Sequence, residues 1–588
     1  MKVQKKSNKD LSKNLIEHIL LSRGIPKDRV AHYLFPKKSM KPSYEGLENL
    51  EEAKELLHKH IQNQSKIYIQ IDTDADGMTS ASIMYQFLTK DLGVDEELVY
   101  YHIPQTKTHG ISTDKVLEIQ PNLVIAPDAS SGEFDIHKKL HELGIDVLVL
   151  DHHLVDGDRY SEHAVVVNNQ LSKSFKWKGL TGANIVLLFC EYYSDKLKLK
   201  INTDKYLDLA TVGMIADRGS LLDESVFYYA QTGLKQINNP LLKLIISNNN
   251  NIKDDTDLVI KDVEYNIAPL INAVTRQAKD DDLQLVVDAL FNRSYEVHNK
   301  RLKMDTSVVQ EAFRRMNNAR NRQNNKVKEA IEHLREHIKS KQSNENQVLF
   351  VNSTGVIEDS GINGLVAIKL AEEYKRPTLV MSLKGETFRG SGRNFNNSPV
   401  VDFKQVIEDS GMFEYALGHS GAFGVGITLD NVVEAIDVLN EQLEYIDYDL
   451  TYYVDLVYEG QPNAKEIQEI ANHKHLWGQG IEEPTVFIHG VRINKNNIKL
   501  MGKNGNTLKI NLGTCDSIKF QVTEDEKRAL TSAESDMVEV NLVGKCGINS
   551  YKGMNAPQIL ITDFEIVELQ NESPFDAIDE FNSTELPF

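Results

Sequence analysis

The sequence predicts an α/β protein that ends in a small all-β barrel, and three observations support this fold class. Between residues 66 and about 220, short apolar runs alternate with helical patterns, which is typical of a parallel sheet covered by helices. A second, smaller segment of the same kind runs from about 346 to 440. From about 450 onward, short strand-like runs are separated by Asn/Gly turns such as NKNN and KNGN, which indicates a β-barrel.

Length and charge limit what the chain can be. It has 588 residues and a formal net charge of -20. That length predicts roughly three to five domains, and the negative charge means that any surface for nucleic acid must be local. The three cysteines lack metal-binding spacing, which favours a reducing compartment without disulfide bonds. No apolar run reaches the roughly 18 residues of a membrane span. We therefore expect a cytoplasmic protein that does not bind membranes.

Changes of pattern along the chain predict six parts. They are a helical lead-in (1–60), the larger α/β domain (61–292), a connecting basic helix (293–345), the smaller α/β domain (346–445), the barrel (446–570) and an acidic disordered tail (571–588). The stretch 563–588 holds eight acids and no Lys or Arg. A segment of this composition cannot bury enough apolar surface to fold, so we expect it to be largely disordered.

The stretch 293–341 reads as one or two long helices with an unusual charge. It carries thirteen Lys or Arg residues against six Asp or Glu residues, in a chain that is otherwise acidic. Two interpretations remain open. The segment is either a solvated linker helix or a basic wall that faces a polyanion.

Acids and histidines follow four apolar runs of the larger α/β segment, which we interpret as four strand ends. Carboxyl ends of strands are where open α/β sheets bind ligands. The runs KIYIQI, LVIAP, DVLVL and ATVGMIA are followed by Asp72, Asp74 and Asp76, by Asp128, by Asp151, His152 and His153, and by Asp217. Clustered carboxylates at buried strand ends repel one another and are poorly solvated, so they need cations.

The donor set suggests which cations these are. Hard carboxylate oxygens with imidazole suit Mn²⁺ or Mg²⁺ better than a sulfur-rich zinc site. There are enough groups for two ions about 3.5–4 Å apart, an arrangement that serves phosphoryl displacement. A single DxD is often a turn or a helix cap, and a single HH pair is often surface or core. Their recurrence at four strand ends is what favours a metal centre.

This arrangement resembles the DHH phosphoesterase superfamily, and the resemblance narrows to RecJ, the single-strand-specific 5′→3′ exonucleases. The segments that carry it, in this order, are DADG (74–77), DHH (151–153), APLINAVTRQAKD (268–280), RGSGR (389–393), ALGHSGAFGVGI (416–427) and LWGQGIEEPTVFIHGVRI (476–493). The resemblance implies a parallel-sheet DHH domain and a smaller α/β DHH-associated domain joined by a long helix, followed by an OB-like β-barrel.

The resemblance also implies roles for the acids and histidines. Two ions, Mn²⁺ or Mg²⁺, would be bound by Asp72, Asp74, Asp76, Asp128, His152 and Asp217. The signature Asp151, His152 and His153 would be catalytic, with His153 as a further candidate ligand and Asp151 orienting a histidine, because metal-bound imidazoles usually donate their other N–H to a carboxylate or carbonyl. The superfamily often has a histidine where this chain has Gln70, and we expect Asp72 to replace it.

The second domain is expected to hold the strand. Turns with backbone N–H groups and a guanidinium would bind phosphate at Gly390, Ser391, Gly392 and Arg393, and a terminal 5′-phosphate would contact His419 and Ser420. Arg276 and the basic helix would line a channel. The alternative is that the glycines only make tight turns. On the barrel, single-strand contacts are expected at Lys499, Lys503, Lys509, Tyr551 and Lys552, although turn lysines are usually just solvated.

The leading hypothesis is a monomeric, metal-dependent 5′→3′ exonuclease that releases 5′-mononucleotides from single-stranded DNA in repair, recombination or replication. The alternatives are a DHH phosphodiesterase for short RNA or cyclic dinucleotides and an inactive RecJ-like replication scaffold. The terminal DAIDEFNSTELPF is similar to the acidic tip of bacterial single-stranded-DNA-binding proteins. It could bind a helicase or another tip-binding partner, or it is only an acidic solubility tail.

Overall fold

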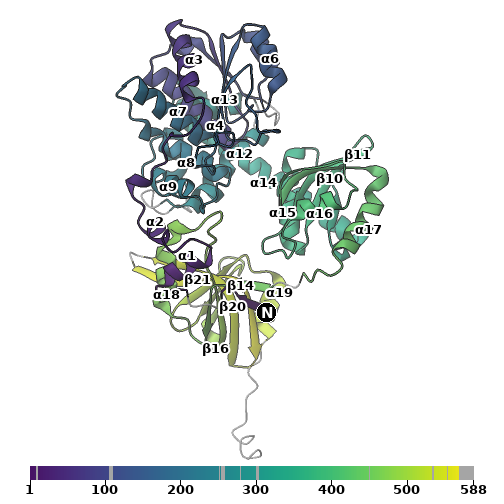
Figure 1. Cartoon of the computed structure of the whole chain (residues 1–588). Coiled ribbons are helices and arrows are strands. Elements are labelled where there is room, and N and C mark those ends of the chain that lie inside the picture. The colour runs from purple at the N-terminus through teal and green to yellow at the C-terminus, as the bar shows by residue number, and fades with distance from the viewer. Residues whose placement is uncertain are drawn as a thin grey trace, which may run out of the picture. The chain divides into compact units, whose positions relative to one another are not determined.

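The computed structural model describes residues 1–568 except 8–10, 105–109, 250–251, 253–257, 278–279, 300–302, 449–450, 533–534 and 552–553. The chain forms two compact units (Figure 1). One comprises Met1–Ala31, Asp449–Trp477 and Ile481–Phe588, and the other comprises His32–Tyr448 and Gly478–Gly480. Within the described ranges, every helix is too short or too polar to cross a membrane.

The second unit begins with a fully parallel sheet of five strands. Its order is β3-β2-β4-β5-β6, with β2 (Ile67–Gln70), β3 (Val99–His102), β4 (Leu123–Pro127), β5 (Asp146–Asp151) and β6 (Val165–Asn168). From β2 the chain moves to β3 on one side and then returns to β4 on the other. The point between β2 and β4 is therefore the topological switch point, where open sheets of this kind bind ligands.

Buried helices pack around this sheet. Every residue of α4 (Ala75–Gln86) is buried, and this helix packs against α7 (Gly182–Lys196) and α8 (Leu207–Ala216). The other helices are α2 (Val30–Leu34), α3 (Leu50–Gln62), α5 (Thr113–Ile119), α6 (Phe134–Glu142), α9 (Glu224–Gly233), α10 (Pro240–Ser247), α11 (Ile260–Asp262), α12 (Ala268–Gln277) and α13 (Asp280–Leu290). The π-helical turn η5 (Val263–Ile267) leads into α12.

The prediction that the connecting helix starts near 293 is wrong. Two short antiparallel strands, β7 (Glu296–Asn299) and β8 (Met304–Ser307), pair with each other before it. The long helix α14 then runs from Val308 to Lys341. Ser307 fixes its start, since the backbone of this residue is extended and its hydroxyl accepts a hydrogen bond from Gln310 N, which caps the helix.

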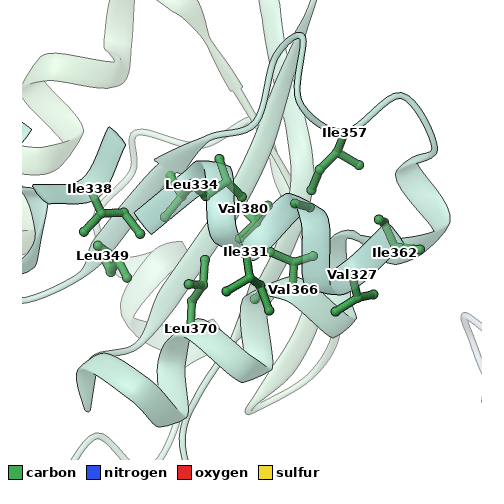
Figure 2. Close-up of a cluster of buried hydrophobic side chains, with 13 residues drawn as sticks. Val327, Ile331, Leu334, Ile338, Leu349, Ile357, Ile362, Val366, Leu370 and Val380 are labelled. Atoms are coloured by element: carbon green, nitrogen blue, oxygen red, sulfur yellow. The ribbon is translucent and has the colours of Figure 1, made fainter. Parts of the chain in front are cut away.

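Helix α14 is a core element of the second unit. Its first half packs against α12 and α13. Its second half contributes Val327, Ile331, Leu334 and Ile338 to an apolar cluster with α15 (Asn363–Tyr374), β9 (Leu349–Asn352) and β10 (Thr378–Lys384) (Figure 2). A solvated linker is therefore not a correct description of this helix.

Four of the nine Lys and Arg side chains of α14 form ion pairs with acids of other elements in the described part of the chain. Arg315 contacts Asp282 on α13, and Arg335 donates two hydrogen bonds to Glu373 on α15. The Nζ of Lys326 lies 3.3 Å from Oδ2 of Asp359. Arg314 and Arg315 also hold Glu311 of the same helix. These side chains fix the helix to its neighbours, so the predicted basic wall is mostly neutralised within the protein.

The smaller α/β part contains a mixed sheet of five strands in the order β12-β13-β11-β10-β9. Only β9 and β10 are parallel, and the other neighbours are antiparallel. The remaining elements are β11 (Thr387–Arg393), α16 (Phe403–Asp409), β12 (Tyr415–His419), β13 (Ala422–Thr428) and α17 (Val432–Gln442).

The first unit contains a seven-stranded sheet in the order β15-β16-β20-β21-β19-β18-β17. Its strands are β15 (Leu456–Glu459), β16 (Thr485–Asn494), β17 (Ile498–Met501), β18 (Thr507–Asn511), β19 (Asp516–Phe520), β20 (Met537–Tyr551) and β21 (Met554–Glu568). The helices of this unit are α1 (Leu15–Ser22), α18 (Ala464–Asn472) and α19 (Glu524–Ser532). The N-terminal strand β1 (Lys2–Lys5), within the predicted helical lead-in, pairs with β14 (Thr451–Val454).

The predicted disorder of 563–588 is wrong for its first part. Residues 563–568 belong to β21, where they pair with β20 from Val538 to Val543. Asp563 and Glu565 alternate with Phe564 and Ile566, so this part of the strand carries acidic side chains on one face and apolar side chains on the other. The predicted tail 571–588 and Lys552 lie outside the described residues.

Candidate metal centre and phosphate pocket

The three aspartates after β2 begin the candidate site at the switch point. Asp74 is the N-cap of α4, and its Oδ1 accepts a hydrogen bond from Gly77 N at 3.0 Å. Asp76 lies in the first turn of the same helix, where the helix dipole favours negative charge. A DxD motif can simply cap a helix, and one oxygen of Asp74 does so here. The cap does not exclude a ligand role, because a carboxylate has two oxygens.

Backbone groups of α7 hold the carboxylate of Asp76. Gly182 N donates to its Oδ2 at 2.9 Å, and Ala183 N donates to its Oδ1 at 3.2 Å. Burial raises the pKa of Asp76 to about 6; the charge of His152 opposes this rise, and Asp217 and Asp74 add to it. The protein therefore fixes this carboxylate in place without neutralising it.

Two glycines on neighbouring helices leave room for the carboxylates of Asp76 and Asp128 in the cluster. A Cβ on Gly213 of α8 would lie 2.3 Å from Asp76 Oδ1, and a Cβ on Gly182 of α7 would lie 2.3 Å from Asp128 Oδ1. Any side chain at these two positions would push a carboxylate out of the cluster.

Asp128 lies directly after β4 with a left-handed backbone, at φ 64°. Its carboxylate is almost fully buried, and its Oδ1 accepts no hydrogen bond. Burial raises the pKa of Asp128 well above its usual value, and the charges of Asp76 and Asp74 add to that shift. A buried acceptor oxygen that faces other acids is what a bound cation would compensate.

The signature after β5 divides its roles between its three residues. The Asp151 carboxylate accepts hydrogen bonds from Ser131 N, His152 N, His153 N and His153 Nδ1. Burial favours a higher pKa for Asp151, but the hydrogen bond and charge of His153 hold it below its usual value. In return, the hydrogen bond to Asp151 raises the pKa of His153 to about 9. Asp151 therefore orients His153, as predicted for one of the two histidines.

His152 lies at the centre of the cluster. Its Nε2 is 3.2 Å from Asp128 Oδ1, 3.7 Å from Asp217 Oδ2 and 3.9 Å from Asp76 Oδ2. Burial lowers the pKa of His152. The negative charge of Asp76 favours a higher pKa, but the effect of burial is larger. A neutral imidazole surrounded by carboxylates is a suitable metal ligand.

Asp217 reaches the cluster from a helix. It is the C-cap of α8, so the predicted strand end is wrong at this position. The apolar run LATVGMIA is buried on nearly all sides, and a helix of that kind loses the polar face that would distinguish it from a strand.

The donor atoms form groups that fit metal ions. One group is Asp72, Asp74 and Asp128, a second is Asp76, His152 and Asp217, and a third joins Asp128 to Asp151, His152 and His153. The first two share no residue, so the centre has donors for two ions. Oxygen donors with one imidazole suit Mn²⁺ or Mg²⁺, and the buried Oδ1 of Asp128 supports this fit.

Gln70 has a different task from its histidine counterpart. It is buried, and its Oε1 accepts hydrogen bonds from Tyr68 Oη at 3.1 Å and Ser112 N at 2.9 Å. Its Nε2 donates to Ile71 O. This side chain ties β2 to the segment at 112. Asp72 joins a donor group with Asp74 and Asp128, and its role as a metal ligand stays a prediction.

A pocket of about 280 Å³ opens beside this centre. It is lined by Thr73, Asp74, Ala75, Asp76, Ala216, Asp217, Arg218, Asn272, Thr275, Arg276 and His419. Predicted metal ligands and two predicted nucleic-acid-binding residues, Arg276 and His419, therefore line one pocket. Sequence reasoning assigned no role to Asn272, Thr275 and Arg218. The spacing of Asn272 and Arg276, four residues apart on α12, was the available signal for the first of these.

The predicted phosphate turn at RGSGR is wrong. Gly390, Ser391 and Gly392 lie inside β11, between β10 and β13, so the ladders on both sides use their backbone groups. The glycines are needed for packing, because a Cβ on Gly392 would lie 2.5 Å from the ring of Phe423. Ser391 precedes Arg393 by two residues, so both face the same side of the sheet. His419 ends β12, and Ser420 and Gly421 form the turn to β13.

Arg393 lacks an acidic partner among the described residues. Its Nη1 donates to Gly392 O at 2.7 Å, and its guanidinium lies against Gly364, at the start of α15. Burial lowers the pKa of Arg393 to about 10, and the positive charges of Arg276 and Arg218 add to this shift. Guanidiniums that repel one another in this way favour a bound anion.

Comparisons with known proteins identify the family of this chain. The DHH family N-terminal domain matches residues 66–214, and the RecJ OB domain matches residues 460–563. The protein named as the SPbeta prophage-derived single-strand DNA-specific exonuclease YorK of Bacillus subtilis (strain 168) is 33% identical over 565 residues, which are 94% of this chain and 96% of that protein.

More distant relatives carry the RecJ name. The single-stranded-DNA-specific exonuclease RecJ of Bacillus subtilis is 25% identical over 95% of this chain and 68% of its own length. The crystal structure of RecJ from Thermus thermophilus in complex with Mn²⁺ has a TM-score of 0.70 at 20% identity, covers 94% of this chain and 76% of that chain, and shows the shared fold. This chain belongs to the RecJ-like single-strand-DNA-specific exonucleases of the DHH superfamily.

Proposed function

We propose that this protein is a cytoplasmic, monomeric, metal-dependent exonuclease that degrades single-stranded DNA in the 5′→3′ direction, releasing 5′-mononucleotides during repair, recombination or replication. The observation that carries the proposal is the pocket of about 280 Å³ lined by Asp74, Asp76, Asp217 and also Arg276. A polyanion in this pocket would contact the guanidinium of Arg276 next to the cation-binding carboxylates. The names of the RecJ-like relatives support the substrate class.

The donor groups would hold two ions of Mn²⁺ or Mg²⁺. The residues are Asp72, Asp74, Asp76, Asp128, His152 and Asp217. Such ions activate water and neutralise charge at the phosphate that is cleaved. The chain itself orients groups of this centre: the N–H groups of α7 fix the ligand Asp76, and Asp151 fixes His153, the further candidate ligand, through Nδ1. No serine or cysteine nucleophile is required.

The 5′→3′ direction would follow from how the strand end is held. Arg276 and Arg393 would contact the terminal 5′-phosphate, with Ser391, His419 and Ser420 near them. Holding that end beside the metal centre would place the first internal phosphodiester at the ions. Each cleavage would then release one nucleotide with its 5′-phosphate.

Digestion of end-labelled strands tests this proposal. Single-stranded DNA labelled at the 5′ or the 3′ end is incubated with Mn²⁺ or Mg²⁺, and a duplex and an RNA strand of the same sequence serve as controls. Mononucleotides should appear first from the 5′ label, and the duplex should persist. Early release from the 3′ label would contradict the direction, and equal cleavage of the duplex would contradict the strand specificity.

Two other functions give different results in that assay. A phosphodiesterase for short RNA or cyclic dinucleotides would cleave those molecules and leave long DNA intact. An inactive RecJ-like scaffold would bind DNA without cleaving it under any metal. Retention of the acid and histidine set argues against the scaffold, because carboxylates that repel one another are costly unless they bind cations.

We also propose that the terminal LPF sequence binds a protein that recognises tips of single-stranded-DNA-binding proteins, such as a helicase. Phe588 carries a ring that can be buried, and the acids Asp579, Glu580 and Glu585 before it can pair with Arg or Lys. A purified tip-binding protein should retain the full-length chain, and Phe588→Ala should abolish retention. A tip peptide should compete for the same partner. If retention is absent or unaffected by both changes, the segment is only an acidic solubility tail.

A further inference from the structure

Arg218 occupies an unusual backbone position at the end of α8. The helix closes with hydrogen bonds from Arg218 N to Ile215 O at 3.1 Å and from Gly219 N to Met214 O at 3.1 Å. This pattern is a Schellman motif, whose C′ position is left-handed and usually glycine. Here the C′ residue is Arg218, with φ 62°, and the glycine follows one residue later.

Strain alone does not assign a role to Arg218, because the neighbouring helix ends in the same way. At the end of α7, Lys198 N donates to Asp195 O and Leu199 N donates to Ser194 O, and Lys198 has φ 55°. Both helices thus place a cation at C′. The difference is in what the two side chains meet: Arg218 lines the pocket of the metal centre, and Lys198 does not.

The surroundings of Arg218 are those of an anion-binding group. It shares the pocket with Arg276, and its charge acts on the guanidinium of Arg393. In the described part of the chain, its guanidinium has one long hydrogen bond, from Nη2 to Gln479 Oε1 at 3.4 Å. Its charge also acts on Glu264 of η5, but burial still raises the pKa of that acid. Two guanidiniums thus line the pocket, and a third, from a separate element, lies close enough for their charges to act on it.

We propose that Arg218 is a substrate-binding residue that contacts a terminal phosphate of the bound strand together with Arg276 and Arg393. This inference rests on the proposed function. A terminal phosphate monoester carries a charge of about -1.5 to -2 at neutral pH, which exceeds that of an internal phosphodiester. A third guanidinium is therefore best matched by a phosphorylated strand end. The sequence signal is weak, because this residue stands outside the motifs that carry the family resemblance.

A pair of matched glycine variants tests the proposal. Arg218→Gly and Lys198→Gly each remove a cation and each give the C′ position the residue that it favours. Binding to single-stranded DNA with a 5′-phosphate or a 5′-hydroxyl is measured in chelator, over a range of salt concentrations, together with Tm. Leaving out divalent ions prevents cleavage during the measurement.

Arg218→Gly should weaken binding of the phosphorylated strand about tenfold, because a charged hydrogen-bond partner is lost. It should lower the salt slope by about 0.7. The hydroxylated strand should lose less, and Tm should be equal or higher in both variants, since glycine relieves the left-handed backbone. Lys198→Gly should leave binding unchanged.

Three results would overturn the proposal. The first is that Arg218→Gly binds DNA as tightly as wild type. The second is that its affinity falls equally for the 5′-phosphorylated and the 5′-hydroxylated strand. The third is a fall in Tm that Lys198→Gly does not show, which would make the role of Arg218 structural. The binding assay is read without cleavage. A wild-type protein that binds but does not degrade single strands would therefore refute the proposed exonuclease and leave the result for Arg218 readable.

Discussion

Two groups of buried acids in this protein are treated in opposite ways. Asp76 and Asp128 at the switch point face other carboxylates, and burial raises the pKa of both. Glu311 on α14 is buried to the same degree but accepts hydrogen bonds from Arg314 and Arg315, which hold its pKa at about 2. In the described part of the chain, no lysine or arginine forms an ion pair with Asp76 or Asp128.

The difference separates structural acids from functional ones. Removing a carboxylate from water is costly in both places. On α14 the protein supplies the counter-charge permanently, and the result is a fixed connection between helices. At the switch point the counter-charge must come from solution, so the folded chain retains a region that metal ions stabilise. Each of the following predictions tests one side of this comparison.

The largest expected effect is on the uncompensated side. Asp128→Asn should reduce the exonuclease rate by about a thousandfold or more, because a metal ligand is lost. The metal-free protein should be at least as stable as wild type, since one repelling charge is gone. Rates in Mn²⁺ and Tm with and without Mn²⁺ measure both effects. Full activity, or an undiminished rise of Tm on adding Mn²⁺, would refute the two-metal centre.

The compensated side should respond in stability and not in chemistry. Glu311→Gln removes the counter-charge of Arg314 and leaves Arg315 with Asp282 as its one acidic partner in the described part of the chain, so the free energy of unfolding should fall by about 2–3 kcal/mol. The exonuclease rate of the folded fraction should be unchanged below the new transition. Urea unfolding and rates at low temperature provide the measurements. A loss under about 0.5 kcal/mol would show that the arginines find other partners.

The two acids should also have opposite pH dependence. The folded pKa of Asp76 lies above its usual value, so its contribution to stability is present below about pH 4 and is lost as the pH rises through about 6. The folded pKa of Glu311 is depressed, so its contribution is present above about pH 4.5 and is lost as the pH falls towards 2.

Stability profiles in chelator from pH 3 to 7 test this contrast. Asp76→Asn should remove a decline of up to about 3 kcal/mol between pH 4 and 6. Saturating Mn²⁺ should remove the same decline from wild type, because the metal replaces the missing counter-charge. If wild type in chelator shows no such decline, the carboxylate of Asp76 is compensated after all.

The smallest expected effect concerns the uncompensated arginines. Arg393→Ala should weaken single-strand binding and lower its salt slope by about 0.7, which corresponds to one phosphate contact. Metal binding should persist, since Arg393 joins no donor group. Titration with DNA at several salt concentrations and with Mn²⁺ separates the two. An unchanged salt slope would remove Arg393 from the phosphate contacts.

Much of the metal centre was predictable, because its chemistry is local in sequence. Short apolar runs that end in Asp72–Asp76, Asp128 and Asp151 specify a strand end and a donor together. Asp217 was assigned to a site but to the wrong kind of element, since a fully buried helix and a buried strand are both apolar throughout. The role of Gln70 depends on a contact 42 residues away, with Ser112, which no local pattern encodes.

The second domain was harder to predict for a packing reason. The glycine pattern at 390 and 392 predicts turn residues, but these glycines lie in a central strand where a side chain would meet Phe423 or the backbone of Val380. The sequence shows the surplus of cations over 293–341, yet Asp282 and Glu373, which pair with Arg315 and Arg335 of α14, lie on other helices. The charge pattern of a segment gives its excess of positive charge, but it does not show which acids from other segments pair with those charges in the folded protein.

The position of α14 limits how this protein can be divided. Its 34 residues correspond to a rod of about 50 Å. One half of this rod packs with α12 and α13, and the other half completes the apolar cluster with α15, β9 and β10. A cut anywhere within the helix would expose apolar surface on both fragments, so neither α/β part should be soluble by itself. A chimera in which one α/β part is replaced by its homologue should therefore fold only if the whole of α14 is exchanged with that part.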